Sequence, residues 1–358
     1  MVSVAFEQCQ QEPVAPLSLE YFTPIEFERH HALLGGRILG VAGFGAPRPP
    51  FLAASCPFVD TGMQVLGAGC LYEVWFGSQP VRHHTAGAIA AGSSADLTFG
   101  CLQLSETSGA GLDELSRAAY ASLFQFLDRN GTSSHGHRQL LRIWNYFSGI
   151  TADADGMERY RRFSVGRHEA FEAAGRLVAQ APAACALGRP AGPLTIYFLA
   201  ARGAGQPVEN PRQVSAWRYP PQYGPRSPTF SRATLAQAGG MPLLFVSGTA
   251  SIVGHRSMHI GDPRAQASET IANVRAVLAE AERMGCVPQP GALRLKAYLR
   301  RADDLPVVRA AIQQAFGEQV QPVYLQAEVC RPELQLEIEC CQVPAAWLAA
   351  QCIDAAHG

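Results

Sequence analysis

Residues 334–341, LQLEIECC, alternate apolar and polar side chains as an extended strand does. Because successive side chains of a strand point to opposite faces, Gln335, Glu337 and Glu339 share one face. Periodicity alone favours an ordinary strand with a solvated acidic face. A buried carboxyl in the same place would behave differently, since burial raises the pKa of a glutamate and lets it act as a general acid near neutral pH.

The segment 158–171, ERYRRFSVGRHEAF, has the pattern of a helix with an arginine on its aromatic side. Tyr160, Phe163, Arg167 and Phe171 fall on one helical face, three or four residues apart. An arginine that faces inward needs an anionic partner. That partner is either an internal Asp or Glu in a structural ion pair or a bound anion, and the spacing leaves both open.

Tyr219 and Arg232 flank the segment 219–233, YPPQYGPRSPTFSRA. Proline-rich loops hold their side chains stiffly, which suits a clamp on a bound molecule. Arg226 lies in the same segment and is the alternative cation for such a clamp. Spacing alone does not choose between the two arginines.

A cysteine and a small-residue turn are weaker candidates. Cys330 is an isolated cysteine, and such residues are most often buried structural thiols. The turn SGTAS, residues 247–251, places Gly248, Thr249 and Ala250 after a strand. It lacks the pattern of a phosphate-binding loop, so a turn without a ligand is favoured on sequence alone.

Composition sets the broad class of the protein. The 358 residues suggest two domains, and 47% apolar with 16% charged residues allow a large core. The formal net charge is -1, and no cluster of Lys or Arg favours nucleic acid or a membrane as partner. No zinc-like ligand spacing or dinucleotide fingerprint is present, so neither a metal nor a cofactor is expected. With no signal-peptide pattern and no span-length apolar stretch, we expect a cytoplasmic protein.

The segments that must position these residues occur twice in one order, β-α-β-α-β-β. In the C-terminal part the pattern predicts a strand, a helix, a strand, a helix and two strands, at residues 241–254, 265–285, 292–301, 305–317, 323–329 and 334–343. In the first half, strand-like segments between Gly36 and Leu104 precede a helix, a strand, a helix and two strands, at residues 111–129, 140–150, 156–177, 194–202 and 213–220. This internal repeat indicates duplication of one α/β unit.

The expected fold is therefore α/β (α+β), with two β-α-β-α-β-β units, each a mixed sheet with helices on one face. The Pro- and Gly-rich segment 219–233 suits a linker between them. We expect an N-terminal domain with extra strands over residues 1–220 and a C-terminal domain over 221–358.

Two family resemblances follow from longer motifs. SGTAS, AQASETIANVRAVL and AEVCRPELQLEIE resemble the YjgF (Rid) family, trimers whose subunits pack two helices on one face of a sheet, like the small chorismate mutases. Rid deaminases carry a substrate-binding Arg six residues before the position of Cys330. Here that position is Tyr324, so imine deamination is not expected.

RIWNYFSGI, ERYRRFSVGRHEAF, YGPRSPTFSRA and SGTASIVGH together resemble the chorismatase family over nearly the whole chain. Members release pyruvate from chorismate and have a YjgF-like C-terminal domain beside a related N-terminal one. The resemblance implies that Glu337 is the catalytic acid/base, buried with a raised pKa. Some members hydrolyse chorismate to a dihydroxycyclohexadiene carboxylate, whereas others form 3-hydroxybenzoate or both 3- and 4-hydroxybenzoate.

The same resemblance assigns the other candidate residues. The 3-hydroxybenzoate-forming members carry a Cys where Cys330 stands, which favours a hydroxybenzoate product. Chorismate has two carboxylates, which call for Arg and hydroxyl donors. The resemblance gives one carboxylate to Tyr160 with Arg167 and the other to Tyr219 with Arg232.

Ala250 is the small residue expected to border the substrate ring. A non-catalytic YjgF-like protein that binds a small anionic metabolite is the alternative to an enzyme. Two fused units cannot complete a trimer, so the extra N-terminal segments would give a monomeric pseudo-trimer. A small homo-oligomer fits the sequence equally well.

Overall fold

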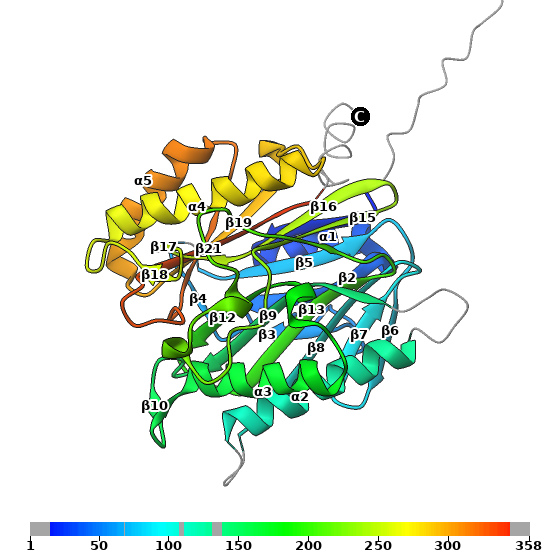
Figure 1. The fold of residues 1–358 in the computed structure, drawn as a ribbon. Coiled ribbons are helices and arrows are strands. Elements are labelled where there is room, and N and C mark those ends of the chain that lie inside the picture. The colour runs from blue at the N-terminus through cyan, green and yellow to red at the C-terminus, as the bar shows by residue number, and fades with distance from the viewer. Residues whose placement is uncertain (1–14, 68, 107–110, 131–137, 344–358) are drawn as a thin grey trace, which may run out of the picture.

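The computed structural model describes residues 15–67, 69–106, 111–130 and 138–343. These residues form three main β-sheets, and each sheet has helices on one face (Figure 1). The expected mixture of sheets and helices is confirmed. Among the described residues, no helix is long and apolar enough to cross a membrane.

The first main sheet belongs to the C-terminal repeat and has the strand order β14-β15-β16-β21-β19-β20-β4. Two helices cover its outer face, and the buried stripe of α4 includes Ile271, Val274 and Val277. Asp262 caps α4 by accepting a hydrogen bond from the backbone N of Ala265 at 3.0 Å. The elements are β4 (Gln64–Val65), β14 (Gln206–Val208), β15 (Ala233–Ala238), β16 (Met241–Thr249), α4 (Pro263–Arg283), β19 (Leu293–Leu299), α5 (Leu305–Phe316), β20 (Val323–Gln326) and β21 (Leu336–Gln342).

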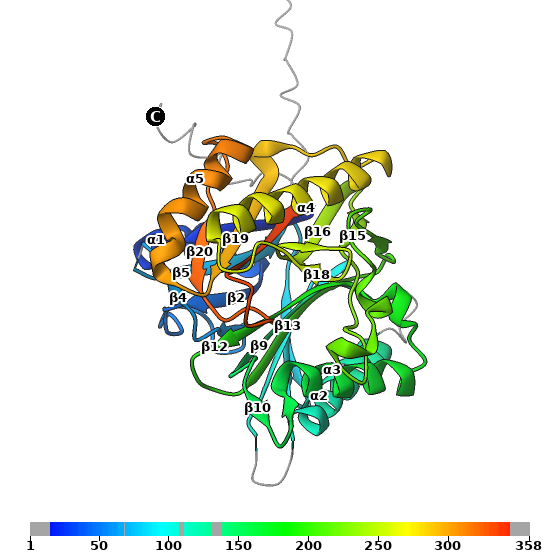
Figure 2. The same cartoon turned by 60° about the vertical axis from the view of Figure 1, so that its left-hand side comes forward.

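The second sheet has the order β12-β9-β13-β8-β7-β6 and carries α2 and α3 on its outer face (Figure 2). Aromatic residues join the helices, and the rings of Phe124 and Phe171 meet edge to face at 4.9 Å. The elements are β6 (Arg82–Ala86), β7 (Ile89–Ser93), β8 (Leu97–Leu104), α2 (Leu112–Asn130), β9 (Gln139–Ser148), α3 (Arg159–Ala173), β12 (Ala183–Arg189) and β13 (Leu194–Ala201).

The third main sheet has four strands in the order β1-β5-β2-β3 and packs on α1. Thr23 and Glu26 close a capping box at the start of α1. The elements are β1 (Leu17–Phe22), α1 (Pro24–Leu34), β2 (Ile38–Phe44), β3 (Phe58–Asp60) and β5 (Leu71–Gly77).

Two short hairpins, β10 (Asp153–Ala154) with β11 (Met157–Glu158) and β17 (Ile252–Val253) with β18 (Arg256–Ser257), complete the paired strands. Single 3-10 turns are η1 (Gly35–Arg37), η2 (Val178–Gln180), η3 (Ala216–Arg218), η4 (Pro221–Tyr223), η5 (Pro290–Ala292) and η6 (Ala302–Asp304).

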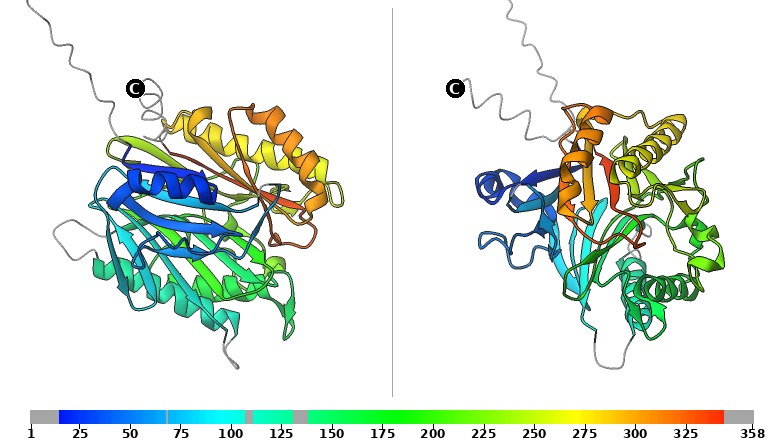
Figure 3. Two further views of the ribbon diagram at one scale, coloured as in Figure 1. Left: turned by 180° about the vertical axis from the view of Figure 1, so that it is seen from behind. Right: turned by 90° about the vertical axis from the view of Figure 1, so that its left-hand side faces the viewer.

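The inner faces of the three sheets share one core, with the helices outside (Figure 3). Trp75 of β5 lies 5.8 Å from Trp144 of β9 and 6.4 Å from Phe245 of β16, measured between ring centroids. Each sheet therefore closes one side of the shared core. Within one chain this arrangement has the three-part form that the sequence suggested for a pseudo-trimer.

Strand pairing confirms the internal repeat and corrects its last two strands. In both units one strand pairs parallel with the central strand and the next pairs antiparallel: β12 and β13 on β9, and β20 and β21 on β19. Residues 194–202 therefore match β21. The strand expected at 213–220 is wrong, because this stretch holds an isolated bridge at Gln213 and the turn η3.

Sequence analysis missed β1, β14 and β15, and it also missed β12. The residues of β12, AACALGR, are small and lack both alternation and β-branched side chains, so only pairing with β9 makes them a strand. β14 precedes residue 221 but pairs with β15 of the C-terminal sheet. The division of the chain at residue 220 stays a prediction.

Candidate active site

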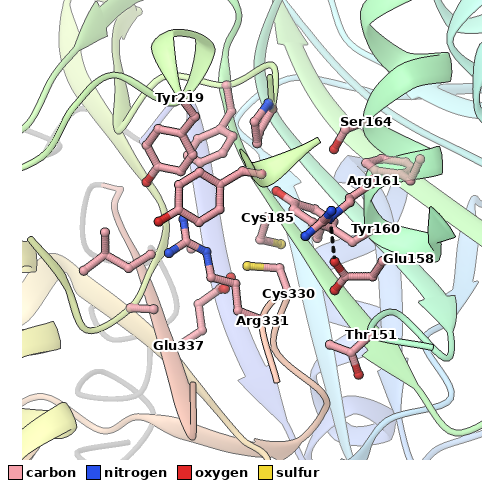
Figure 4. A pocket seen from close by; sticks show the side chains of 18 of the residues that line it. Thr151, Glu158, Tyr160, Arg161, Ser164, Cys185, Tyr219, Cys330, Arg331 and Glu337 are labelled. Atoms are coloured by element: carbon pink, nitrogen blue, oxygen red, sulfur yellow. Dashed lines mark hydrogen bonds and ion pairs between the residues drawn. The ribbon is translucent and has the colours of Figure 1, made fainter. Parts of the chain in front are cut away.

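A cavity of about 480 Å³ lies where the two repeats meet. Strand β12, at the edge of the second sheet, contacts β16 of the first sheet. A hydrogen bond of 2.8 Å from Ala184 N to Ser247 Oγ joins the two strands. The cavity walls come from α3, β12, β16, β21 and the loops before β15 and β21 (Figure 4). All seven candidate residues from the sequence line this cavity: Tyr160, Arg167, Tyr219, Arg232, Ala250, Cys330 and Glu337.

Glu337 is the buried acid of the cavity. It is the second residue of β21, its side of the strand faces the second sheet, and the residue is 4% exposed. Burial raises its pKa to about 8, and the negative charge of Glu339 adds to the rise. No described residue makes a hydrogen bond to Glu337 Oε1. The solvated acidic face that periodicity favoured is therefore wrong, whereas burial with a raised pKa is confirmed.

The carboxyl group of Glu337 occupies space that is free because Gly248 has no side chain. A Cβ atom built on Gly248 would lie 1.7 Å from Glu337 Oε1 and 3.1 Å from the Cβ of Cys185. The sequence placed Gly248 in a turn, but the residue belongs to strand β16 and faces the cavity. Sequence analysis did not relate it to Glu337, since that contact is made across neighbouring strands.

Arg167 is a buried cation to which no described residue supplies a carboxylate. The residue is 3% exposed, and its guanidinium lies over the rings of Tyr120 and Phe171 at 5.0 and 5.8 Å. Its Nε and Nη2 have no hydrogen-bond partner, and no Asp or Glu among the described residues forms an ion pair with it. The internal ion pair that the sequence left open is therefore absent from this part of the chain. A bound anion remains as the partner of this charge.

Arg232 is the second cation in the wall, and it is 4% exposed. Its Nη2 donates to Tyr219 Oη at 2.9 Å and to the carbonyl of Val214 at 2.6 Å. Its Nε has no partner within the described structure. The alternative cation, Arg226, pairs with Glu172 at 3.3 Å, is half-exposed and does not line the cavity.

Cys330 lies in the loop between β20 and β21, four residues after β20 ends, whereas the strand predicted over residues 323–329 would have ended directly before it. Burial, with the nearby charge of Glu337, raises the pKa of its thiol to about 12. The group is therefore a neutral S–H near pH 7 and not a thiolate nucleophile. Burial also raises the pKa of Tyr160, with contributions from Cys330 and Glu337, which places these three groups together.

Ala250 follows β16 directly and is 5% exposed. Asn273 of α4 holds its carbonyl through a 3.0 Å hydrogen bond from Nδ2. The small side chain therefore faces the cavity from a fixed backbone.

Arg331 and Cys185 are among the wall residues that sequence analysis missed. Arg331 stacks on the rings of Tyr223 and Tyr219 at 4.1 and 5.4 Å and donates to the carbonyl of His255 at 3.0 Å. It lies in a loop without periodicity, so only its neighbour Cys330 could have drawn attention to it. Cys185 lies in the strand β12 that was not foreseen.

The cavity thus combines a carboxyl group that binds a proton near neutral pH with two arginines that have free N–H groups. Such a site can hold a doubly anionic molecule and protonate it. Among the described residues, no group of three His, Cys, Asp or Glu is placed to hold a metal ion.

Known proteins resemble this chain over most of its length. Residues 73–200 match the family model described as chorismatase FkbO/Hyg5-like, N-terminal. A 3-hydroxybenzoate synthase from Streptomyces hygroscopicus is 36% identical over 318 residues, which are 86% of this chain and 92% of that protein. A chorismatase from Streptomyces rapamycinicus is 36% identical over 302 residues, 80% of this chain and 87% of that protein. A crystal structure of a chorismatase is similar with a TM-score of 0.80 at 30% identity, covering 93% of this chain and all of that one.

Proposed function

Since the chain belongs to the chorismatase family, we propose that it converts chorismate to pyruvate and 3-hydroxybenzoate. The protein is an enzyme, and its substrate is chorismate. The observation that carries the proposal is the buried Glu337, with a pKa raised to about 8, in one cavity with two arginines that have free N–H groups. The relative named 3-hydroxybenzoate synthase supports this product.

Glu337 supplies the proton that starts the reaction. The carboxyl group donates it to the terminal methylene carbon of the enol ether, which leaves an electrophilic carbon of oxocarbenium character. A carboxyl with a pKa near 8 is protonated at neutral pH, and general acid catalysis contributes about 10²- to 10⁴-fold in rate.

The remaining steps return this proton. The neighbouring ring hydroxyl attacks the ring carbon that bears the ether oxygen, its proton goes to the Glu337 carboxylate, and the bond between that ring carbon and the ether oxygen breaks. Pyruvate leaves with that oxygen as its keto group, and an epoxide remains on the ring. One C–O bond of the epoxide then breaks, its oxygen gains a proton and a ring C–H proton is lost, so that the aromatic hydroxybenzoate forms with no net change in protons.

Two arginine–tyrosine pairs hold the carboxylates of chorismate in this proposal. Tyr160 with Arg167 binds one, and Tyr219 with Arg232 binds the other. The free Nε and Nη2 of Arg167 and the free Nε of Arg232 supply donors for an anion. Arginine N–H groups bind carboxylates strongly where water is excluded.

Cys330 and Ala250 border the ring in the proposed complex and select the product. A neutral thiol near Glu337 and Tyr160 can shape the wall or pass a proton while the epoxide opens. Hydrolytic release of a dihydroxycyclohexadiene carboxylate is the alternative outcome. Formation of 4-hydroxybenzoate beside the 3-isomer is a second one.

Product analysis tests the function. Purified protein is incubated with chorismate, pyruvate is measured with lactate dehydrogenase, and ring products are separated by chromatography. Equal amounts of pyruvate and 3-hydroxybenzoate are expected from the wild type, and neither from Glu337→Gln. A diene diol would assign the hydrolytic branch. Chorismate that is bound without release of pyruvate would make the protein a binding protein and overturn the proposal.

The same proposal includes a monomeric enzyme in the cytoplasm. Three sheets with outer helices already surround one core within a single chain, which favours a monomer over a small homo-oligomer. Light scattering after size-exclusion chromatography measures this mass directly.

A further inference from the structure

Four charged side chains form a buried network where the three sheets meet. Glu339 Oε1 accepts hydrogen bonds from Lys296 Nζ of β19 at 2.9 Å and from Trp144 Nε1 of β9 at 2.8 Å. Its Oε2 accepts from Arg142 Nη2, also of β9. Lys296 donates in turn to Glu73 of β5 at 2.6 Å. Each of the four charged side chains is at most 5% exposed.

The network begins next to the proposed acid. Glu339 and Glu337 are alternate residues of β21, so they share one face and lie about 7 Å apart along the strand. Opposite them on β19, Lys296 pairs with Glu339 and Tyr298 with Glu337 in the antiparallel register. One end of the network is therefore fixed by three sheets and the other lies beside the cavity.

Few charged or titratable groups face Glu337 from the elements around it. These groups are Glu339 of its own strand, Arg142 of β9, Cys185 of β12, Tyr298 of β19, Tyr160 of α3 and Cys330 of the loop before β21. Burial opposes ionisation of Glu339, but Lys296, Arg142 and the bond from Trp144 hold its pKa at about 2. Glu339 is thus the carboxylate that stays charged beside Glu337 at any working pH.

We propose that Glu339 is a positioning residue for the reaction: locked between Arg142 and Lys296, it fixes a negative charge beside Glu337 that keeps the proton on Glu337 until chorismate takes it. The inference rests on the proposed function, because it assumes that Glu337 is the acid. Glu339 touches neither substrate nor reacting atoms and acts only through Glu337.

Stability alone does not require this network. Buried ion pairs lose their hydration, so apolar side chains of similar volume hold sheets together at least as well. Apolar side chains would not provide a fixed charge beside the acid. The charges of the two carboxylates and two cations sum to zero. Neutralising Glu339 leaves the network net positive and neutralising Arg142 leaves it net negative, so the two changes shift the potential at Glu337 in opposite directions.

The test compares Glu339→Gln, Arg142→Gln and the double variant, all of which keep the Glu73–Lys296 pair intact. The titration of Glu337 is followed by NMR in protein labelled with ¹³C in the glutamate carboxyls, with Glu337→Gln to assign the signal. Glu339→Gln should lower the pH of half-titration by about one unit, and Arg142→Gln should raise it by about one unit. The double variant should return close to the wild type.

Activity gives the second readout. Glu339→Gln should move the alkaline fall of kcat with chorismate to lower pH by the same unit, and Arg142→Gln should move it to higher pH. Arg283→Gln, which removes only an exposed pair with Glu280 on α4, is the control and should shift neither titration nor activity.

Shifts in the same direction in both single variants, or no shift in folded variants, would overturn the inference. Loss of folding in both singles and the double would assign the network a purely structural role and overturn it as well. The NMR titration needs no turnover, so its result is distinct from failure of the proposed function, which appears as a wild type that releases no pyruvate.

Discussion

Gly248 lies so close to Glu337 that a Cβ atom at residue 248 would come within 1.7 Å of Glu337 Oε1. Gly248 is not one of the glycines with a positive φ, so its backbone suits any residue. Space, and not conformational freedom, therefore requires glycine at this position. The contact joins β16 to β21 and fixes where the acid can point.

Gly248→Ala should displace the Glu337 carboxyl while the sheet keeps its pairing. A displacement of about 1 Å at a reacting group costs roughly a hundredfold in rate, so kcat for pyruvate release should fall by about that factor. Circular dichroism should show an unchanged fold. Gly36→Ala is the matched control, because a Cβ there meets nothing within 4 Å. Full activity in Gly248→Ala would show that Glu337 does not need its present position.

Glu337 should also make stability depend on pH. Burial raises its pKa from 4.5 to about 8, so between these values the folded protein holds a proton that the unfolded chain releases. The stabilisation is complete below pH 4.5 and is lost at about 1.4 kcal/mol per pH unit as pH rises to about 8. The Glu337→Gln variant has no carboxyl group at this position, so its folding stability should not show this fall with pH.

Thermal unfolding of both proteins at pH 5 and pH 9 measures the effect. The Tm of Glu337→Gln minus the Tm of the wild type should be several degrees larger at pH 9 than at pH 5. A difference in Tm that does not change with pH would show that the carboxyl group is already ionised in the folded protein.

Local periodicity was enough to predict two elements that carry the site, β21 and α3. The alternation of β21 and the aromatic face of α3 are properties of single segments, so Glu337, Tyr160 and Arg167 could be placed before the fold was known. The strand β12 could not be foreseen, because its small residues become a strand only through pairing with β9. Cys185, which it carries into the cavity, was missed with it.

Relationships between segments were beyond the sequence. The spacing of α3 left the partner of Arg167 open. Only the folded structure shows that its guanidinium packs on Tyr120 and Phe171 and that no carboxylate of the described residues pairs with it. The fit of Gly248 against Glu337 depends on neighbouring strands. Neither relationship leaves a periodic signal in the chain.

Arg167→Met should separate substrate binding from folding. A buried cation without a carboxylate contributes little to the stability of the empty protein, so its Tm should stay the same or rise. Without the cation one chorismate carboxylate loses its partner, and KM should rise about a hundredfold. Arg226→Met is the control, since Arg226 is half-exposed and paired with Glu172 outside the cavity. An unchanged KM in Arg167→Met would remove Arg167 from the proposed clamp.

Cys330→Ala should change which product leaves the cavity more than how fast pyruvate is released. Burial raises the pKa of this thiol to about 12, so a neutral S–H, and not a thiolate, faces the ring. Removing it leaves the Glu337 proton donation in place but changes the wall where the epoxide opens. Chromatography should show a smaller share of 3-hydroxybenzoate among the ring products, with pyruvate release within about tenfold of the wild type. Cys56→Ala, buried against the four-stranded sheet, should change nothing, whereas an unaltered product mixture in Cys330→Ala would take Cys330 out of product selection.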